Sequence, residues 1–279
     1  MKLLRYGPAG QEKPGLIDDE GRVRDLSKKL GDIDPLTLAP ERLSQLAAMD
    51  ISALPVVEGT FRYAPPVKGI GKILAIGLNY AEHAAETQLN LPPEPLVFAK
   101  AITCLSGPND DLTLPRNSTQ TDYEVELAVI IGSRAQYVDE KNALDYVAGY
   151  AVMNDFSERE YQKDRGGQWI KGKSHDGFGP LGPWLVTADE VPDPQNLNLW
   201  CEVNGERRQD SNTKHMIFGV AHIISNLSQY MTLLPGDVIS TGTPSGVGMG
   251  RTPPEYLKPG DVVELAVEGL GRQRQQIRA

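Results

Sequence analysis

Apolar residues alternate with other residues along a segment near the middle of the chain. They recur with a period of two at Val125, Leu127, Val129 and Ile131. This period and the glycine at position 132 predict a β-strand over residues 122–132. Successive side chains of a strand point to opposite faces. Glu124 and Glu126 should therefore share the face opposite Val125 and Leu127.

Shorter apolar runs between glycines, prolines and polar turns predict further elements. Strands are expected at 2–6, 15–17, 22–24, 72–77, 96–99, 147–153, 197–203 and 272–277. Helices are expected at 41–49, 78–86, 143–147, 158–163 and 217–230. Two Pro-Gly-Asp repeats, at 235–239 and 259–263, should each begin a strand, as in a roll of short antiparallel strands. The pattern predicts a mainly β protein with some α (α+β).

A proline-rich stretch interrupts this pattern early in the chain. Pro55, Pro65 and Pro66 are spaced among single apolar residues and predict an extended linker over 51–69. We therefore expect two domains, a small one over residues 1–65 and a larger one over residues 66–279.

Composition restricts the partners of the chain. The 28 basic residues against 37 acidic ones give a net charge of -9, which argues against a nucleic-acid partner. Cys104 and Cys201 lie far apart without C-x-x-C spacing, so neither a disulfide framework nor a thiolate zinc site is expected. With no apolar run long enough for a membrane span or an export signal, we expect a cytoplasmic protein.

The two glutamates of the central strand are the first candidates for chemistry. Adjacent carboxylates repel one another, and a hard divalent cation with oxygen ligands would relieve that repulsion. A solvated strand face is the alternative interpretation. Asp155 is a third acidic candidate, because it ends the strand predicted at 147–153.

A histidine and a glutamate form a second candidate. His83 and Glu86 are three residues apart on a predicted helical turn, so they share a face, where the carboxylate can raise the basicity of the imidazole. A pair on the protein surface is the alternative. The prolines and leucines of Thr87 to Pro95 indicate a mobile flap beside it.

Three further segments contain polar residues and glycines that could form part of a site. Ser157 and Glu160 fit a capping box, and the helix behind it would place Arg159 and Gln162 on one face. Residues 164–180 form a polar, glycine-rich loop that contains Lys171 and Lys173. Residues 240–248 contain three glycines whose N–H groups, with the Thr243 hydroxyl, can surround an anion: Gly242, Gly246 and Gly248.

In their order along the chain, these segments resemble the fumarylacetoacetate hydrolase family. The matching segments are 79–86, 124–126, 154–159, 173–176 and 241–248. The resemblance covers roughly residues 70 to 279, and the N-terminal part resembles an accessory domain of the family. It implies a mixed β-sandwich roll, usually as a homodimer. His175 departs from the family pattern, in which an aromatic residue is more frequent.

The resemblance also implies roles for individual residues. Metal ligands for Mg²⁺ or Mn²⁺ would be Glu124, Glu126 and Asp155. Substrate contacts would be Lys173, Arg159, Gln162, Thr243 and Gly242, with Arg159 and Gln162 at a developing oxyanion. His83 with Glu86 would activate water. Lys173 is preferred to Lys171 because it immediately precedes Ser174-His175-Asp176.

These roles imply a hydrolase that cleaves the C3–C4 bond of a 2,4-diketo acid and releases pyruvate. The substrate would be an acylpyruvate or a 2,4-diketo-3-deoxy sugar acid. The motifs are nearest to those of ureidoglycolate lyases and sugar-acid hydrolases, and the sugar-acid hydrolase is favoured because the dyad and the flap are both present. Ureidoglycolate lyase and oxaloacetate decarboxylase activities are alternatives, and a metal-stabilised keto-acid binding protein is a non-catalytic one.

Overall fold

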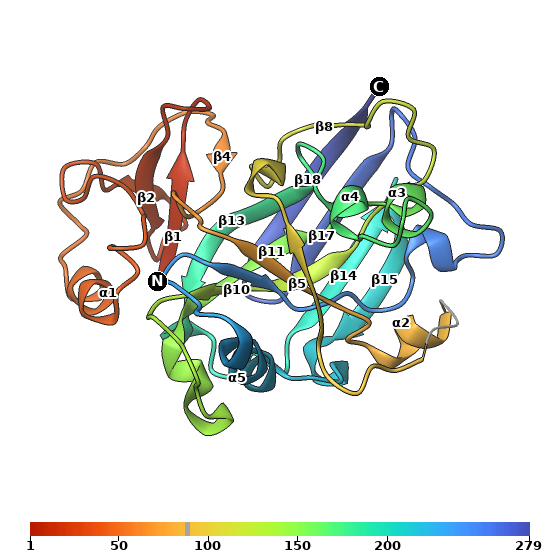
Figure 1. Cartoon of the computed structure of the whole chain (residues 1–279). Coiled ribbons are helices and arrows are strands. Elements are labelled where there is room, and N and C mark those ends of the chain that lie inside the picture. Colours follow the sequence, from red (N-terminus) through yellow and green to blue (C-terminus); the bar gives the residue numbers. More distant parts are fainter. Residues whose placement is uncertain (87–89) are drawn as a thin grey trace.

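The computed structural model describes residues 1–86 and 90–279 and shows two large sheets with short helices at their edges (Figure 1). Over these residues the larger sheet has the strand order β3-β2-β1-β13-β11-β10-β16-β5-β6, with β4 beside β1 and β7 beside β13. Its strands are β1 (Lys2–Tyr6), β2 (Lys13–Ile17), β3 (Val23–Asp25), β4 (Tyr63–Ala64), β5 (Ile73–Gly77), β6 (Leu96–Lys100), β7 (Leu105–Ser106), β10 (Val125–Ile131), β11 (Val147–Asn154), β13 (Gly179–Thr187) and β16 (Val238–Ser240). The expected mainly β fold with mixed sheets is confirmed.

A second sheet packs against the first. Its order is β15-β14-β17-β18-β8, and β9 pairs separately with β12. The bounds are β8 (Leu112–Thr113), β9 (Thr121–Asp122), β12 (Ser157–Glu158), β14 (Asn198–Val203), β15 (Glu206–Asn212), β17 (Val262–Val267) and β18 (Gly271–Arg278). Apolar side chains of β14 and β17 join those of β10 and β11 in one core, as in a β-sandwich.

Helices are short and lie around the sheets. The α-helices are α1 (Pro40–Ala47), α2 (Ala81–Glu86), α3 (Arg159–Lys163), α4 (Ile170–Lys173) and α5 (Val220–Tyr230). The 3₁₀ turns are η1 (Ile102–Cys104), η2 (Glu140–Tyr146), η3 (Ala188–Glu190), η4 (Thr213–His215) and η5 (Gly248–Gly250). Among the described residues, none of these helices combines the length and the apolar character needed to cross a membrane.

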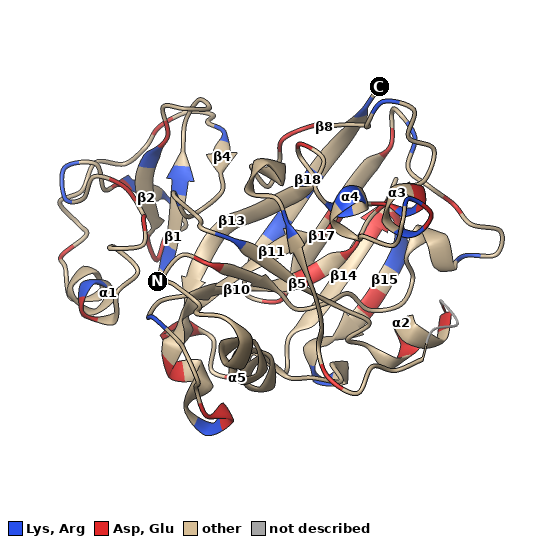
Figure 2. Ribbon diagram, in the orientation of Figure 1, with Lys and Arg blue, Asp and Glu red and all other residues tan. Residues whose placement is uncertain are grey.

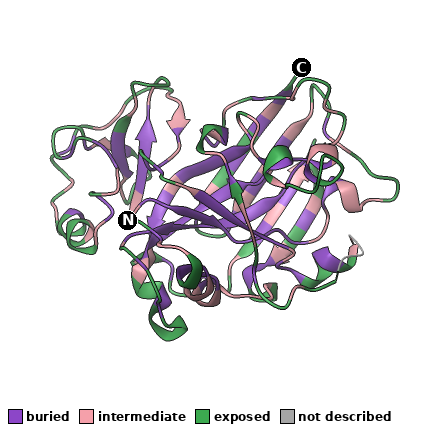
Figure 3. Cartoon of the chain, viewed as in Figure 1, coloured by how far each residue is buried: buried purple, intermediate pink, exposed green. Residues whose placement is uncertain are grey.

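The central strand β10 is enclosed on all sides. It pairs with β11 and β16, and all of its residues are buried (Figure 3). Both faces are covered, so its polar side chains cannot reach bulk solvent. The interpretation of this segment as a solvated strand face is therefore wrong.

One local expectation holds only in part, and another is wrong. The strand after the first Pro-Gly-Asp repeat, β16, pairs antiparallel with β10, as expected, but parallel with β5, with Val238 opposite Ile73, because a long segment separates β16 from β5 and no hairpin links them. The helix α3 begins at Arg159 and has no side-chain cap. Ser157 instead donates its hydroxyl hydrogen to the carbonyl of Asp155, because this residue belongs to strand β12.

The N-terminal segment continues the large sheet. Leu3 of β1 lies opposite Leu185 of β13, and both side chains belong to the same apolar core. Figure 1 shows β1, β2 and α1 at one end of the molecule. The expected division into domains 1–65 and 66–279 stays a prediction.

Candidate active site

Three carboxylates meet where β10 begins and β11 ends. In the antiparallel register of these strands, Val125 lies opposite Asn154, and the N–H of Asp155 donates to the carbonyl of Glu124 at 2.9 Å. One oxygen each from Glu124, Glu126 and Asp155 lies within 4.8 Å of the other two. These residues are 4%, 2% and 0% exposed. The pairing of the two strands therefore assembles the acidic cluster that the sequence predicts.

Two cations bind the first of these carboxylates. Lys173 places its Nζ 2.6 Å from Glu124 Oε2 and 2.7 Å from Asp155 Oδ2. Arg159 Nη1 lies 2.8 Å from Glu124 Oε1, and its Nε donates to Asp122 Oδ2 at 2.8 Å. Burial opposes ionisation of Glu124, but the charges of Lys173 and Arg159 prevail and hold its pKa well below the usual range.

Glu126 has a different environment. Its Oε2 accepts hydrogen bonds from the Ser240 hydroxyl at 2.6 Å and the Gly242 N–H at 2.7 Å. No lysine or arginine in the described part of the chain lies within ion-pair distance of it. Burial raises its pKa well above the ordinary value, and the charges of Asp155 and Glu124 raise it further. Ionisation of Glu126 is therefore disfavoured unless a cation lies beside it.

This donor set fits a hard divalent cation. The three side chains offer only oxygen ligands, which Mg²⁺ and Mn²⁺ prefer, and they already lie close together. Lys173 neutralises part of the charge on two of them, and a cation beside the third would favour its ionised form. The cluster is a candidate metal site.

A buried lysine that the sequence did not single out completes the cluster. Lys100, the last residue of β6, is 2% exposed, and its Nζ lies 2.5 Å from Asp155 Oδ1. It also donates to the carbonyls of Phe156 and Lys173. The only available signal was a lysine at the end of an apolar strand, a position that lets a side chain point into a site.

The predicted histidine–glutamate pair forms on α2. His83 Nδ1 lies 2.8 Å from Glu86 Oε1, and the Gly246 N–H donates to Glu86 Oε2 at 2.9 Å. His83 is only 6% exposed, so the alternative of a surface pair is wrong. A Cβ at Gly250 would lie 2.6 Å from Glu86 Oε2. Two glycines thus let the backbone of the 240–250 segment enclose the carboxylate. The predicted flap at 87–95 lies partly outside the described residues.

The backbone N–H groups of the glycine-rich segment 240–248 donate to carboxyl groups of the same chain. Gly242 donates to Glu126, Gly246 to Glu86, and Gly248 to Asp122 Oδ1 at 2.7 Å. Gly242 has a φ of +102°, which favours glycine. Its N–H is already used by Glu126, and substrate binding by Gly242 stays a prediction. The segment fixes three acidic side chains around the site.

The 164–180 loop brings one of its two lysines to the cluster. Short helix α4 turns Lys173 inward, whereas Lys171 is exposed and donates to the carbonyl of Arg165 at 2.6 Å. His175 packs against the rings of Tyr161 and Phe178, with ring centroids 5.6 and 5.2 Å away, and does not line the cavity.

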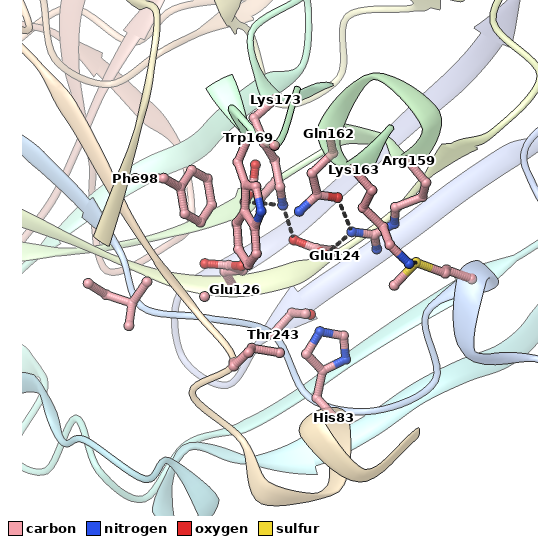
Figure 4. A pocket seen from close by; sticks show the side chains of 16 residues that line it. His83, Phe98, Glu124, Glu126, Arg159, Gln162, Lys163, Trp169, Lys173 and Thr243 are labelled. Carbon is pink, nitrogen blue, oxygen red and sulfur yellow. Dashed lines mark hydrogen bonds and ion pairs between the residues drawn. The ribbon is translucent and has the colours of Figure 1, made fainter. Parts of the chain in front are cut away.

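A cavity of about 230 Å³ joins these groups. Most predicted site residues line it: His83, Glu124, Glu126, Asp155, Arg159, Gln162, Lys173 and Thr243 (Figure 4). Glu86 and Gly242 lie behind this wall and hold His83 and Glu126 in place. Apolar lining comes from Ile76, Leu78, Phe98, Trp169 and Met249. Figure 2 shows that basic and acidic residues lie together around α3 and α4.

The order of the segments and the cavity they build define the class of protein. Residues 72–278 match the family model described as fumarylacetoacetate (FAA) hydrolase C-terminal. The chain therefore belongs to the fumarylacetoacetate hydrolase family.

Relatives and solved structures agree with this assignment. A Burkholderia multivorans protein with a provisional name as a hydrolase is 57% identical, covering 100% of this chain and 99% of the relative. The fumarylacetoacetate hydrolase of Exiguobacterium antarcticum is 34% identical, with a TM-score of 0.87 over 100% of this chain and 99% of that one. Maleylpyruvate hydrolase from Sphingobium sp. SYK-6, solved with manganese(II) and pyruvate, is 28% identical, with a TM-score of 0.83 over the same shares.

Proposed function

We propose that this protein hydrolyses the C3–C4 bond of a 2,4-diketo acid, either an acylpyruvate or a 2,4-diketo-3-deoxy sugar acid, and releases pyruvate. The observation that carries the proposal is one cavity lined by both an acidic cluster and a histidine held by a carboxylate. The maleylpyruvate hydrolase of similar fold, solved with manganese(II) and pyruvate, supports the same substrate class.

Glu124, Glu126 and Asp155 would hold the cation, Mg²⁺ or Mn²⁺. When bound, it would supply a positive charge for the substrate's carboxylate and 2-keto oxygen and for the enolate charge that develops. Thr243 lies beside this position, with its hydroxyl donating to the Val125 carbonyl at 3.0 Å. Lys173 would face the same end of the substrate, which places the keto acid at the acidic cluster.

His83 would act as the general base. A hydrogen bond from its Nδ1–H to Glu86 makes Nε2 the basic nitrogen, and Glu86 would stabilise the imidazolium that forms. Water that loses its proton to His83 would add to C4. The C3–C4 bond then breaks and its electron pair passes to C3, while C4 leaves as the carboxyl carbon of the acid product. The proton that His83 took from water converts the enolate of pyruvate to pyruvate.

Arg159 and Gln162 would stabilise the negative oxygen on C4. Arg159 Nη1 donates to Gln162 Oε1 at 3.1 Å, so the amide hydrogens of Gln162 are the end that can donate to substrate. A preorganised donor of this kind typically contributes about 3 kcal/mol to transition-state stabilisation.

The dyad favours hydrolysis over the alternatives. Oxaloacetate decarboxylation needs no activated water, so it gives no role to His83 and Glu86. A ureidoglycolate lyase or a non-catalytic keto-acid binding protein would likewise not require the complete set of base, lysine and oxyanion residues. We further propose that the protein works in the cytoplasm as a homodimer, with small keto acids as its ligands.

Pyruvate release from acylpyruvates with Mg²⁺ or Mn²⁺ tests the proposal. Glu126→Gln removes a carboxyl group that could ionise beside the metal, so it should weaken metal binding, measured by calorimetry, and turnover together. Glu41→Gln, on the exposed face of α1, is the control and should change neither. Unchanged metal affinity in Glu126→Gln would contradict the ligand assignment.

A further inference from the structure

Among the described residues, three cationic side chains line the cavity, and one of them has no acidic partner there. Arg159 forms an ion pair with Glu124, and Lys173 forms ion pairs with Glu124 and Asp155. Lys163, the last residue of α3, forms no ion pair in the described part of the chain, and its Nζ lies 3.7 Å from Met249 Sδ. The cavity of an acidic protein thus keeps one cation that its own carboxylates do not neutralise.

Lys163 lies on the side of the cavity where the far end of the substrate is expected. It immediately follows Gln162, and Figure 4 shows it on the side of Arg159 and His83, away from Phe98 and Trp169. In the proposed function, the keto acid lies at the acidic cluster, and C4 faces His83 and Gln162. The acyl group beyond C4 then continues toward Lys163 and Met249.

We propose that Lys163 binds a carboxylate at the distal end of the acyl group, so that the preferred substrates are diacids rather than sugar acids with a hydroxylated chain. This inference rests on the proposed function. A carboxylate would pair with the ammonium group, and the carbons before it would contact the Met249 side chain. Hydroxyl groups could accept hydrogen bonds from the ammonium group, but they would lack the opposite charge that makes the pair with a carboxylate stronger.

Two acylpyruvates with equal numbers of acyl carbons test this specificity. Succinylpyruvate ends in a carboxylate and butanoylpyruvate ends in a methyl group. The wild-type protein should release pyruvate from succinylpyruvate with a kcat/KM about 5-fold higher, the upper end of the range expected for one exposed charge pair. The difference should lie in KM.

Variants at position 163 identify the cause. Lys163→Met should remove most of the preference by raising KM for succinylpyruvate while leaving butanoylpyruvate within about 2-fold, since only the charge pair is lost. Lys163→Arg should retain the preference. Lys141→Met, an exposed lysine of η2 outside the cavity lining, should behave as the wild type.

Two outcomes overturn the inference. Equal kcat/KM for both substrates in the wild type would show that no distal anion is recognised. An equal loss for both substrates in Lys163→Met would show that Lys163 acts at the pyruvate end or only stabilises the fold.

Calorimetric binding of both compounds to the wild type and to Lys163→Met separates this inference from the proposed function. Tighter, Lys163-dependent binding of succinylpyruvate without pyruvate release would refute hydrolysis and uphold the anion site. Pyruvate release without any Lys163-dependent preference would uphold hydrolysis and refute the anion site.

Discussion

At the scale of residues, the site is a set of buried charges whose neighbours decide their protonation. Glu124 is held ionised by two cations, whereas Glu126, two residues away, has only a hydroxyl and a backbone N–H as donors. Their pKa values are therefore shifted in opposite directions. Two chemically identical side chains, separated by one residue, thus differ in how readily they ionise because of the elements that surround them.

His83→Ala should lower pyruvate release at least about 100-fold, the usual contribution of a general base. Metal affinity should remain, because His83 is not among the three clustered carboxylates. Steady-state kinetics and calorimetry on one preparation measure both quantities. A fully active variant would exclude the dyad from the mechanism.

Glu158 gives the protein a pH-dependent stability. Neither of its carboxylate oxygens accepts a hydrogen bond from the described residues, and burial, followed by the charge of Glu160, raises its pKa to about 7. A raised folded-state pKa means that the native state retains a proton that the unfolded chain loses. Stability should therefore fall as pH rises from about 4.5 through about 7.

Glu158→Gln removes this titration and should lessen the loss of stability between pH 5 and pH 8 by about 1 to 3 kcal/mol. Urea unfolding at both pH values measures it, with the exposed Glu41→Gln as the control. The same pH dependence in Glu158→Gln and wild type would show that another group is responsible.

At the scale of elements, strand pairing and close approach build the site. The β10–β11 register brings Asp155 beside Glu124 across thirty residues of sequence. Gly77 ends β5 beneath the indole of Trp169, where a Cβ would lie 2.5 Å from a ring carbon. The absence of a side chain at this strand end therefore gives Trp169 its place in the cavity wall.

Gly77→Ala should displace the indole and raise KM for an acylpyruvate about 10-fold, with an overpacking cost of about 1 to 3 kcal/mol in stability. Kinetics and tryptophan fluorescence report the displacement. Gly31→Ala is a matched control, because a Cβ there meets nothing within 4 Å. Wild-type KM in Gly77→Ala would mean that the indole does not contribute to the substrate site.

At the scale of the whole molecule, the N-terminal segment and the rest of the chain share a sheet and a core. Leu3, Leu16 and Leu26 belong to the same apolar cluster as Leu185. The proline-rich segment that suggested a boundary connects two parts that pack together. The activity is expected from residues 66–279, and the shared sheet and core predict that their stability depends on what precedes them.

A fragment of residues 66–279 should therefore be less stable than the full chain, because removal of β1 exposes the edge of β13 and part of the core. Thermal unfolding and light scattering compare the two proteins. A fragment that melts cooperatively at the temperature of the full chain would instead establish residues 66–279 as an independent domain.

The sequence by itself determined the features that depend on local geometry. The period of two placed Glu124 and Glu126 on one strand face, and helical spacing placed His83 beside Glu86, because strand and helix periodicities act over a few residues. The order of the motifs indicated the family. These patterns were sufficient to name most of the polar and charged residues that line the cavity, but not its apolar wall.

Only the tertiary structure decided which distant residues meet. It placed Lys100 on Asp155, directed the glycine N–H groups of 240–248 to Glu126, Glu86 and Asp122, and paired β16 parallel with β5. It also left Lys163 without an acidic partner among the described residues. Such contacts depend on how separate strands and loops pack, and no periodicity within a single segment records that packing.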